Sequence, residues 1–270
     1  MHVRRPDIDF SDVPAHWGST PEFSQHWNAS SFWIPDLERF LNRVMAKALA
    51  SMKADDDPET RRVKSDVRTF IRQEANHYAL HDAFNAIVKR DYDLSAIEQH
   101  VQAEFERLFE TKSLAFLTAY CEGFETFGPP GAIMWLDLLD DMLVGASPEV
   151  IRLWKWHLME EYEHRTVCYD VFKKVHGGYF MRIYGLFYQL VHLQGFSAKV
   201  RAILLEQDRR GMSEAELKES KRRVRALGFR FAWMMLPRAM KALSPFYTPR
   251  NTREPRGYQA YRRAMEPYKV

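Results

Sequence analysis

The sequence contains Phe70-Ile71-Arg72-Gln73-Glu74-Ala75-Asn76-His77 and, further along, Trp156-His157-Leu158-Met159-Glu160-Glu161-Tyr162-Glu163-His164. Each stretch ends in Glu-x-x-His, a spacing that puts the carboxylate and the imidazole on one face of a helix, one turn apart. Apolar residues surround both pairs, which favours helix faces that point into a core. Charged groups are seldom buried without partners, so inward-facing pairs predict a bound metal. The alternative is that both pairs lie on solvated helix faces and flank salt bridges.

Long helices with clear start signals are predicted around both pairs. Asp57-Pro58-Glu59 and Ser147-Pro148-Glu149 each combine an N-cap residue, a proline at the first helical position and an acid near the positive end of the helix dipole. Ser95-x-x-Glu98 and Ser213-x-x-Glu216 are capping boxes. The predicted breaks are Lys53–Asp57, Gly128-Pro129-Pro130-Gly131 and Gly177-Gly178. The expected helices are 35–52, 58–90, 95–127 with a break near 111–113, 132–143, 148–176, 179–206 and 214–236.

The composition favours one large all-α domain with short additions. Of 270 residues, 46% are hydrophobic, whereas only 12 are Gly and 13 are Pro, which favours long helices over strands and turns. We find no convincing strand pattern. The sequence therefore predicts an irregular N-terminal arm over 1–34, a helical-bundle metal-binding domain over 35–206, and a C-terminal helix with a basic tail over 207–270.

Charge and cysteine usage narrow the class of protein. A net charge of +3 is too small for a nucleic-acid-binding surface. Two cysteines, Cys121 and Cys168, make no disulfide framework and suit a reducing compartment. The first residues lack a secretory signal, and no apolar run approaches the ~20 residues that span a bilayer. We therefore expect a cytoplasmic protein.

The C-terminal region combines basic and aromatic residues. Lys221-Arg222-Arg223-Val224-Arg225 precedes Phe229-Arg230-Phe231-Ala232-Trp233-Met234-Met235-Leu236. A basic amphipathic helix of this kind predicts peripheral contact with an anionic membrane. The alternative is that the apolar face packs on the domain itself or on a second subunit, which would make the protein a homodimer.

Two further glutamates are needed for a ferritin-like site, in which two helices each supply Glu-x-x-His and two others each supply one glutamate. Glu38 lies about 14 residues before the end of the first helix and Glu74 about 16 residues after the start of the second, so both sit roughly 21–24 Å from the connecting turn. On the third helix we favour Glu122 because its neighbours are apolar. Glu110 would lie closer to the level of Glu74 along the bundle, and Glu125 lies one turn after Glu122. The predicted fold is a ferritin-like four-helix bundle with additional C-terminal helices.

Other residues share the stripe that carries the two pairs. His81 follows His77 by one turn and His157 precedes Glu161 by one turn, so both are further ligands or hydrogen-bonding supports. Glu160 and Glu163 lie about 100° and 200° around the helix from Glu161, so we expect them to support Glu161 or to be solvated. The predicted metal-binding residues are Glu38, Glu74, His77, Glu122, Glu161, His164, His81 and His157.

Four motifs also resemble those of a known family. They are Ile34-Pro35-Asp36-Leu37-Glu38-Arg39-Phe40, Gln73-Glu74-Ala75-Asn76-His77 with His81, Phe84 and Asn85, Leu117-Thr118-Ala119-Tyr120-Cys121-Glu122, and the stretch Trp156 to His164. From about Phe32 to His176 the chain is similar to bacterial proteins described as predicted metal-dependent hydrolases. The resemblance implies a ferritin-like fold and a metal site. Gly123 departs from it, because a histidine is expected after the third-helix glutamate.

Carboxylate and imidazole donors without thiolate suit Fe, Mn or Zn. Glutamates that bridge two ions, with one histidine for each ion, predict two Fe ions and an O₂-activating oxidase or oxygenase. Such an enzyme would act on a small apolar substrate, with O₂ and an electron donor as partners. Nearby side chains that fit the wall of its pocket are Phe70, Tyr78, Phe124 and Met159. The alternatives are a two-metal hydrolase and a non-enzymatic metal-binding protein.

Overall fold

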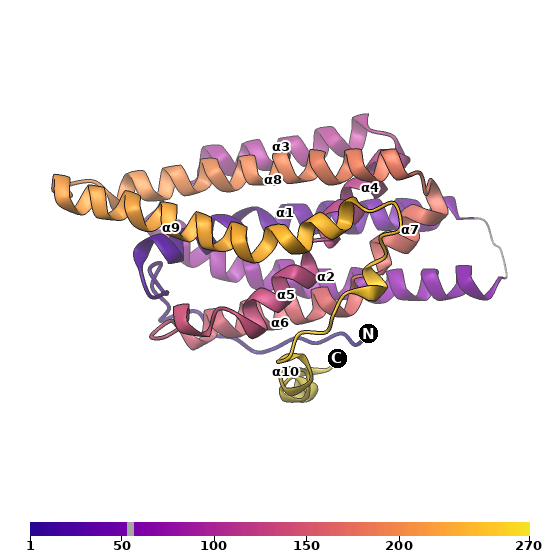
Figure 1. Ribbon diagram of the computed structural model, residues 1–270, viewed down its shortest axis with the longest axis horizontal. Helices are drawn as coiled ribbons and strands as arrows, with labels where there is room; N and C mark the ends of the chain where they lie inside the picture. The colour runs from indigo at the N-terminus through magenta and orange to yellow at the C-terminus, as the bar shows by residue number, and fades with distance from the viewer. Residues whose placement is uncertain (53–56) are drawn as a thin grey trace.

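The computed structural model describes residues 1–52 and 57–270, and over these ranges the chain forms helices and one isolated antiparallel bridge, with no strand (Figure 1). The all-α prediction is confirmed. The α-helices are α1 (Pro21–Ser51), α2 (Pro58–Asp91), α3 (Ser95–Thr111), α4 (Leu114–Glu125), α5 (Gly128–Asp137), α6 (Pro148–His164), α7 (Val167–Val175), α8 (Tyr179–Asp208), α9 (Glu214–Ala239) and α10 (Tyr258–Ala264). The short 3-10 helices are η1 (Asp140–Met142), η2 (Met240–Leu243), η3 (Pro249–Asn251) and η4 (Glu266–Tyr268).

The long helices run lengthwise through the molecule (Figure 1). Helix α1 packs against α2, α3, α4 and α8, while α4 also packs against α7 and α8, and α6 packs against α2 and α5. Large aromatic side chains such as Phe40, Phe70, Trp135 and Trp156 are fully buried between them. Burying one phenylalanine side chain is worth about 1.5–3 kcal/mol, so packing of these faces holds the helices together more than helix propensity does.

Most of the predicted helix starts are observed. The side chain of Asp57 accepts hydrogen bonds from the backbone at Glu59 and Thr60, Ser147 caps α6, and Ser213 forms the full capping box of α9. The capping box predicted at Ser95 is wrong, because the hydroxyl and the N–H of Ser95 both bond to Asp93 instead. The break predicted over Lys53–Asp57 falls, apart from Asp57, outside the described residues.

Helix α1 begins at Pro21, so the prediction that residues 1–34 are irregular is wrong for its second half. The start signal is Thr20 followed by a proline and an acid, the same pattern that opens α2. Pro35 lies inside the helix rather than at its start. Because proline has no N–H, the carbonyl of Ser31 one turn earlier loses its helical partner, and the side-chain amide of Asn85 donates to that carbonyl at 2.9 Å. The division of the chain at residue 206 stays a prediction.

Two other boundaries differ from the predicted ones. The helix predicted over 148–176 is divided into α6 and α7, with a turn at Arg165 and Thr166 directly after His164. The segment Gly128–Gly131 does not only end α4 but forms the first turn of α5, where prolines are tolerated because the first N–H groups of a helix have no partner. Helix α5 therefore starts and ends earlier than the predicted 132–143.

The chain termini meet at one edge of the molecule. Arg4 and Lys269 form the isolated antiparallel bridge, and both ends lie below α2 and α6 in Figure 1. Within residues 1–52 and 57–270, no helix combines the length and the apolar character that crossing a bilayer requires.

Helices α4 and α8 approach closely because each contributes a glycine to the contact. A Cβ on Gly185 would lie 2.5 Å from the backbone of Ala119, and one on Gly123 would lie 2.8 Å from the Cα of Leu186. Backbone atoms cannot yield as a flexible side chain can. The contact explains why Gly123 stands where the resemblance led us to expect a histidine: no side chain fits there.

Alanine at Gly185 tests this contact. We predict that Gly185→Ala destabilises the protein by roughly 1–3 kcal/mol, the usual cost of overpacking a core. Gly195→Ala on the same helix is the matched control, because its Cβ would meet nothing within 4 Å. Removing a mid-helix glycine should stabilise the control by about 0.5–1 kcal/mol. The measurement is urea unfolding of both variants, and equal midpoints would contradict the close approach.

Candidate metal centre

Four helices send acidic and imidazole side chains into one buried volume. Helix α1 supplies one glutamate, α2 supplies one Glu-x-x-His pair, α4 supplies one glutamate, and α6 supplies a second Glu-x-x-His pair with an additional histidine. Every one of these side chains has an exposed fraction of 2% or less. They are Glu38, Glu74, His77, Glu125, His157, Glu161 and His164. The alternative that both pairs lie on solvated helix faces is therefore wrong.

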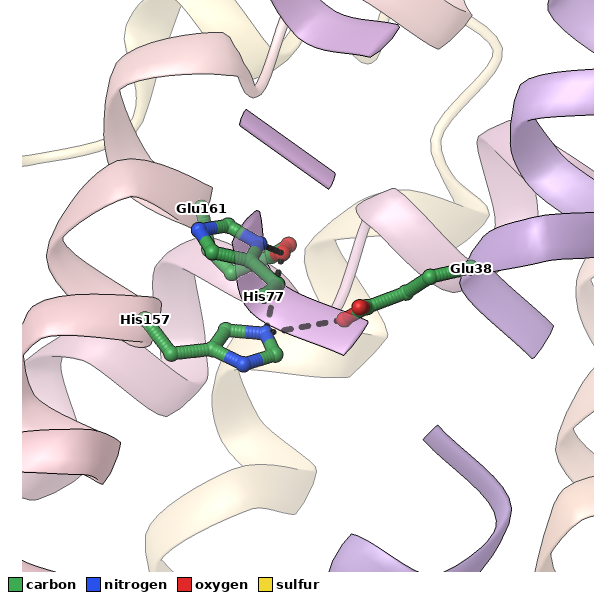
Figure 2. A group of neighbouring side chains, drawn as sticks. All are labelled: Glu38, His77, His157 and Glu161. Atoms are coloured by element: carbon green, nitrogen blue, oxygen red, sulfur yellow. Dashed lines mark hydrogen bonds and ion pairs between the residues drawn. The ribbon is translucent and has the colours of Figure 1, made fainter. Parts of the chain in front are cut away.

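The first group comprises Glu38, His77, His157 and Glu161, each with a ligand atom within 4.8 Å of the others (Figure 2). The Nε2 of His157 lies 3.5 Å from Glu38 Oε1 and 3.2 Å from Glu161 Oε1. The Nδ1 of His77 lies 3.8 Å from the same Glu161 oxygen. These side chains come from α1, α2 and α6 and point toward one another.

The second group comprises Glu74, Glu125, Glu161 and His164, and its ligand atoms also lie within 4.8 Å of one another. The Nε2 of His164 lies 3.3 Å from Glu74 Oε1, 3.3 Å from Glu125 Oε2 and 3.2 Å from Glu161 Oε1. Glu161 belongs to both groups, so its carboxylate lies between two sets of donors. This arrangement fits two ions with a shared ligand.

The polar atoms in this volume lack partners that their burial requires. Both oxygens of Glu38, Glu74 and Glu125 accept no hydrogen bond from the residues that the structure describes. Leaving a buried carboxylate unsatisfied is costly, whereas two divalent cations would offset the charge of four carboxylates. The donors are oxygen and nitrogen only, as Fe, Mn and Zn accept. The residues present therefore fit a pair of metal ions.

Burial and mutual repulsion govern the ionisation of these groups. Burial raises the pKa of Glu38 well above its usual range, and the nearby Glu74 and Glu161 raise it further. Burial also raises the pKa of Glu125, with Glu161 adding to the effect. Burial alone would lower the pKa of His164, but three surrounding carboxylates hold it well above the ordinary value. Without metal ions, bound protons therefore compensate for the negative charge of the carboxylates. Metal ions would supply that positive charge when bound.

His77 is oriented by an ion pair that reaches the N-terminal arm. Its Nε2 donates to Glu160 at 3.2 Å, and the other oxygen of Glu160 accepts from the fully buried Arg4 at 2.9 Å. The Nε2–H is therefore committed, which leaves Nδ1 to face Glu74 at 3.6 Å. Burial would lower the pKa of His77, but Glu74 and Glu160 raise it to about 9. Arg4 also binds Glu163, so both acids beside Glu161 support the site and are not ligands.

His157 is oriented by a chain of hydrogen bonds that ends at α1. Asn85 uses its amide N–H on the Ser31 carbonyl, so its Oδ1 accepts from the Ser31 hydroxyl at 2.7 Å. The Ser31 oxygen must then accept from His81 Nδ1 at 2.7 Å, which leaves His81 Nε2 to accept from His157 Nδ1 at 2.8 Å. The Nε2 of His157 consequently faces the site, with Glu161 Oε1 at 3.2 Å and Glu38 Oε1 at 3.5 Å. His81 lies behind His157 and outside both groups, so it supports His157 and is not the ligand that the sequence predicted.

His164 uses the other ring nitrogen for its supporting hydrogen bond than His77 does. Its Nδ1 donates to the side-chain oxygen of Gln73 at 3.3 Å, and the Gln73 amide donates to the His2 carbonyl at 3.0 Å. The Nε2 of His164 is therefore the atom that faces the three carboxylates. Hydrogen bonds of this kind fix the tautomer and the ring orientation of metal-binding histidines.

Glu122 does not join either group, and this corrects the prediction for the third helix. Its carboxylate lies 3.7 Å from the Arg182 guanidinium and accepts from the Thr126 hydroxyl at 3.3 Å. Burial raises the pKa of Glu122 to about 7, against the opposing effect of Arg182. Glu125, one turn further along α4, faces His164 instead, while Glu110 is exposed. Helix α4 begins at Leu114, and only its last turn, which carries Glu125, lies level with the two Glu-x-x-His pairs.

Sequence reasoning missed several supporting residues for identifiable reasons. Arg4 lies in a segment with no periodic pattern, and its contact with Glu160 spans most of the domain in sequence. Ser31 was assigned to an irregular arm, and Asn85 was noted only through the family resemblance. Among the predicted pocket residues, Phe70 packs on His164 with ring centroids 4.8 Å apart, whereas Tyr78 lies under Arg39 away from the site.

The fold and the site define a helical-bundle protein with a buried set of carboxylate and imidazole donors suited to metal ions. The chain belongs to the family described as "Predicted metal-dependent hydrolase", whose model matches residues 2–253. This confirms the family that the sequence motifs suggested. Searches of curated proteins and of solved structures returned no match.

Glutamine substitutions separate the two glutamates of α4. We predict that Glu125→Gln lowers the metal content of the purified protein, because a neutral amide replaces one carboxylate of the second group. Glu122→Gln is the matched control on the same helix and should retain the metal content. The measurement is the metal-to-protein ratio of protein from metal-supplemented cells. Loss of metal from the Glu122 variant alone would contradict the assignment.

The chain behind His157 can be tested without touching a proposed ligand. We expect Ser31→Ala to weaken metal affinity by about 10–100-fold, as is usual when the support of a metal-binding histidine is removed. Ser30→Ala is the control, because that hydroxyl donates only to the His26 carbonyl of its own helix. The measurement is competition with a chromogenic chelator. Equal affinities of the two variants would show that the chain does not orient His157.

Proposed function

We propose that this chain is a two-metal hydrolase acting on a small-molecule substrate. The observation that carries the proposal is the carboxylate of Glu161, which belongs to both groups of buried donors, in a chain whose family is described as metal-dependent hydrolases. A pair of bound ions would supply Lewis-acid activation of water and of the substrate's carbonyl or phosphoryl oxygen. Zn, Mn and Fe all suit these donors.

The chain's own residues hold this centre rigidly and keep bulk water out. Glu160 and Gln73 fix His77 and His164 by hydrogen bonds, so the other ring nitrogen of each imidazole faces the carboxylates. Aromatic rings pack around the centre. The ring of Trp156 lies against His77, with ring centroids 4.8 Å apart. Preorganised donors in a dry volume strengthen electrostatic effects on a reacting group.

A cavity beside the centre provides room for the substrate. It has a volume of 860 Å³, within the usual range for small-molecule sites, and its inner wall includes Thr126 and Pro130. These residues flank Gly128, whose Cβ would lie 2.7 Å from Glu161 Oε2. The junction of α4 and α5 therefore contributes to the cavity lining through Thr126 and Pro130 and contacts the shared carboxylate at Gly128.

Dioxygen chemistry is the second candidate, and the donor set favours it. Two Glu-x-x-His pairs from α2 and α6 with single glutamates from α1 and α4 are the pattern of ferritin-like di-iron proteins. In that case the ions are two Fe, and the protein is an oxidase or oxygenase that requires O₂ and an electron donor. A non-enzymatic metal-binding role is the third candidate.

Metal reconstitution distinguishes these candidates. Protein loaded in turn with Zn, Mn or Fe is offered chromogenic esters and phosphoesters under argon and in air, and O₂ uptake is recorded with a reductant. We expect turnover that is indifferent to O₂ and is lost in Glu161→Gln, with Glu110→Gln, at an exposed glutamate, as the active control. O₂ uptake by the Fe form without hydrolysis would contradict the hydrolase proposal and support the second candidate. Uptake of many metal ions per chain with neither activity would support storage.

A further inference from the structure

The cavity described above has walls from three parts of the chain. Ile133 of α5 forms part of its inner side, α9 contributes Trp233 and Pro237, and the segment after η2 contributes Phe246 and Tyr247. The cavity therefore depends on α9 and on the segment that follows it, which runs down past α7 toward α10 in the yellow part of Figure 1.

The C-terminal wall is anchored by groups that lie beneath the cavity. Arg182 of α8 pairs with Glu122 and donates to the carbonyls of Ala242 at 2.7 Å and Ser244 at 3.0 Å. The Arg182 guanidinium also lies over the Tyr247 ring, 5.1 Å from its centroid. Glu122, which the sequence suggested as a metal ligand, therefore fixes the wall of the cavity instead.

The cavity has a positive electrostatic character. Its lining includes Arg238, Lys241 and Arg253 but no aspartate or glutamate. Arg253 lies 4.0 Å from Asp137, while no carboxylate of the described residues lies within ion-pair distance of Arg238 or Lys241. The surrounding region has the same bias: residues 207–270 hold 16 Lys and Arg against 6 Asp and Glu, whereas residues 1–206 hold 23 against 30. Arg238 donates to the Met234 carbonyl of its own helix, so its positive charge, like that of Lys241, is not balanced by a carboxylate. Such cations at a cavity favour an anionic occupant.

The mouth of the cavity is apolar and exposed. Trp233 is 74% exposed and Phe246 is 90% exposed, and both line the cavity. Leu236 and Met240 lie exposed on the same stretch of helix. A small inorganic anion would leave this apolar surface in water, so the occupant that matches both features carries an anionic group and an apolar body.

We propose that this cavity binds a single-chain amphipathic anion, with the anionic head on Arg238 and Lys241 and the apolar body along Trp233 and Ile133. The inference deepens the proposed function by naming the class of substrate. That the bound anion is a substrate rests on the proposed function, whereas the binding itself does not. A second copy of the chain is a poorer occupant, because a two-fold contact would bring one positive surface against another.

Binding to metal-loaded full-length protein tests the proposal. The probes are dodecanoate and dodecyl phosphate, which share a chain and differ in head group, with dodecyltrimethylammonium and acetate as controls, all below their micelle concentrations. We expect one dodecyl anion per chain by equilibrium dialysis, with little binding of the cation or of acetate. The stronger of the two anions identifies the head group as carboxylate or phosphate.

Matched variants locate the bound anion. Lys241→Gln and Arg238→Gln should each weaken binding by about 10–100-fold, the loss expected for a hydrogen bond to a charged group. Arg225→Gln, on α9 but outside the cavity lining, is the control and should bind normally. Ile133→Trp should block the alkyl chain while leaving the circular dichroism spectrum and the metal content unchanged.

Three results would overturn the proposal: equal binding of the dodecyl cation, full affinity in the Lys241 and Arg238 variants, or binding to anionic vesicles without binding of the monomeric anions. The last result would assign the face to membrane docking. Failure here is separable from failure of the proposed function. Hydrolysis without anion binding removes the cavity proposal alone, and anion binding without hydrolysis removes the hydrolase proposal alone.

Discussion

Carboxylates from four helices converge on one buried volume. The surrounding structure must compensate for this concentration of negative charge. Glu38, Glu74, Glu125 and Glu161 approach one another, and most of their oxygens accept no hydrogen bond from the described residues. Such an arrangement is stable only if positive charge is supplied, by protons on neighbouring groups or by metal ions. The shared position of Glu161 makes two ions a better match than one.

The support of the site extends well beyond its donors. Arg4 reaches Glu160 from the N-terminal arm, and this ion pair decides which nitrogen of His77 faces the carboxylates. On the other side, Pro35 frees the carbonyl of Ser31 for Asn85, and the resulting chain of hydrogen bonds orients His157. A proline inside α1, which costs a helical hydrogen bond, thus sets the direction of an imidazole on α6.

Local signals made much of this predictable from sequence. The two Glu-x-x-His pairs and the height of Glu38 depend only on helix geometry, which is regular, and the caps at Asp57, Ser147 and Ser213 depend on neighbouring residues. The choice between Glu122 and Glu125 was not predictable, because it depends on where α4 restarts and on an arginine supplied by α8. The contact between Arg4 and Glu160 leaves no periodic trace. These features belong to tertiary packing, which no single segment encodes.

The most direct measurement is a crystal structure of the metal-supplemented protein, with diffraction recorded on both sides of the metal's absorption edge. We predict two anomalous peaks inside the bundle, about 3.5–4 Å apart, one beside Glu38 and His157 and the other beside Glu125 and His164, with Glu161 between them. A single peak, or metal bound only at the surface while these side chains stay empty, would contradict a dinuclear centre.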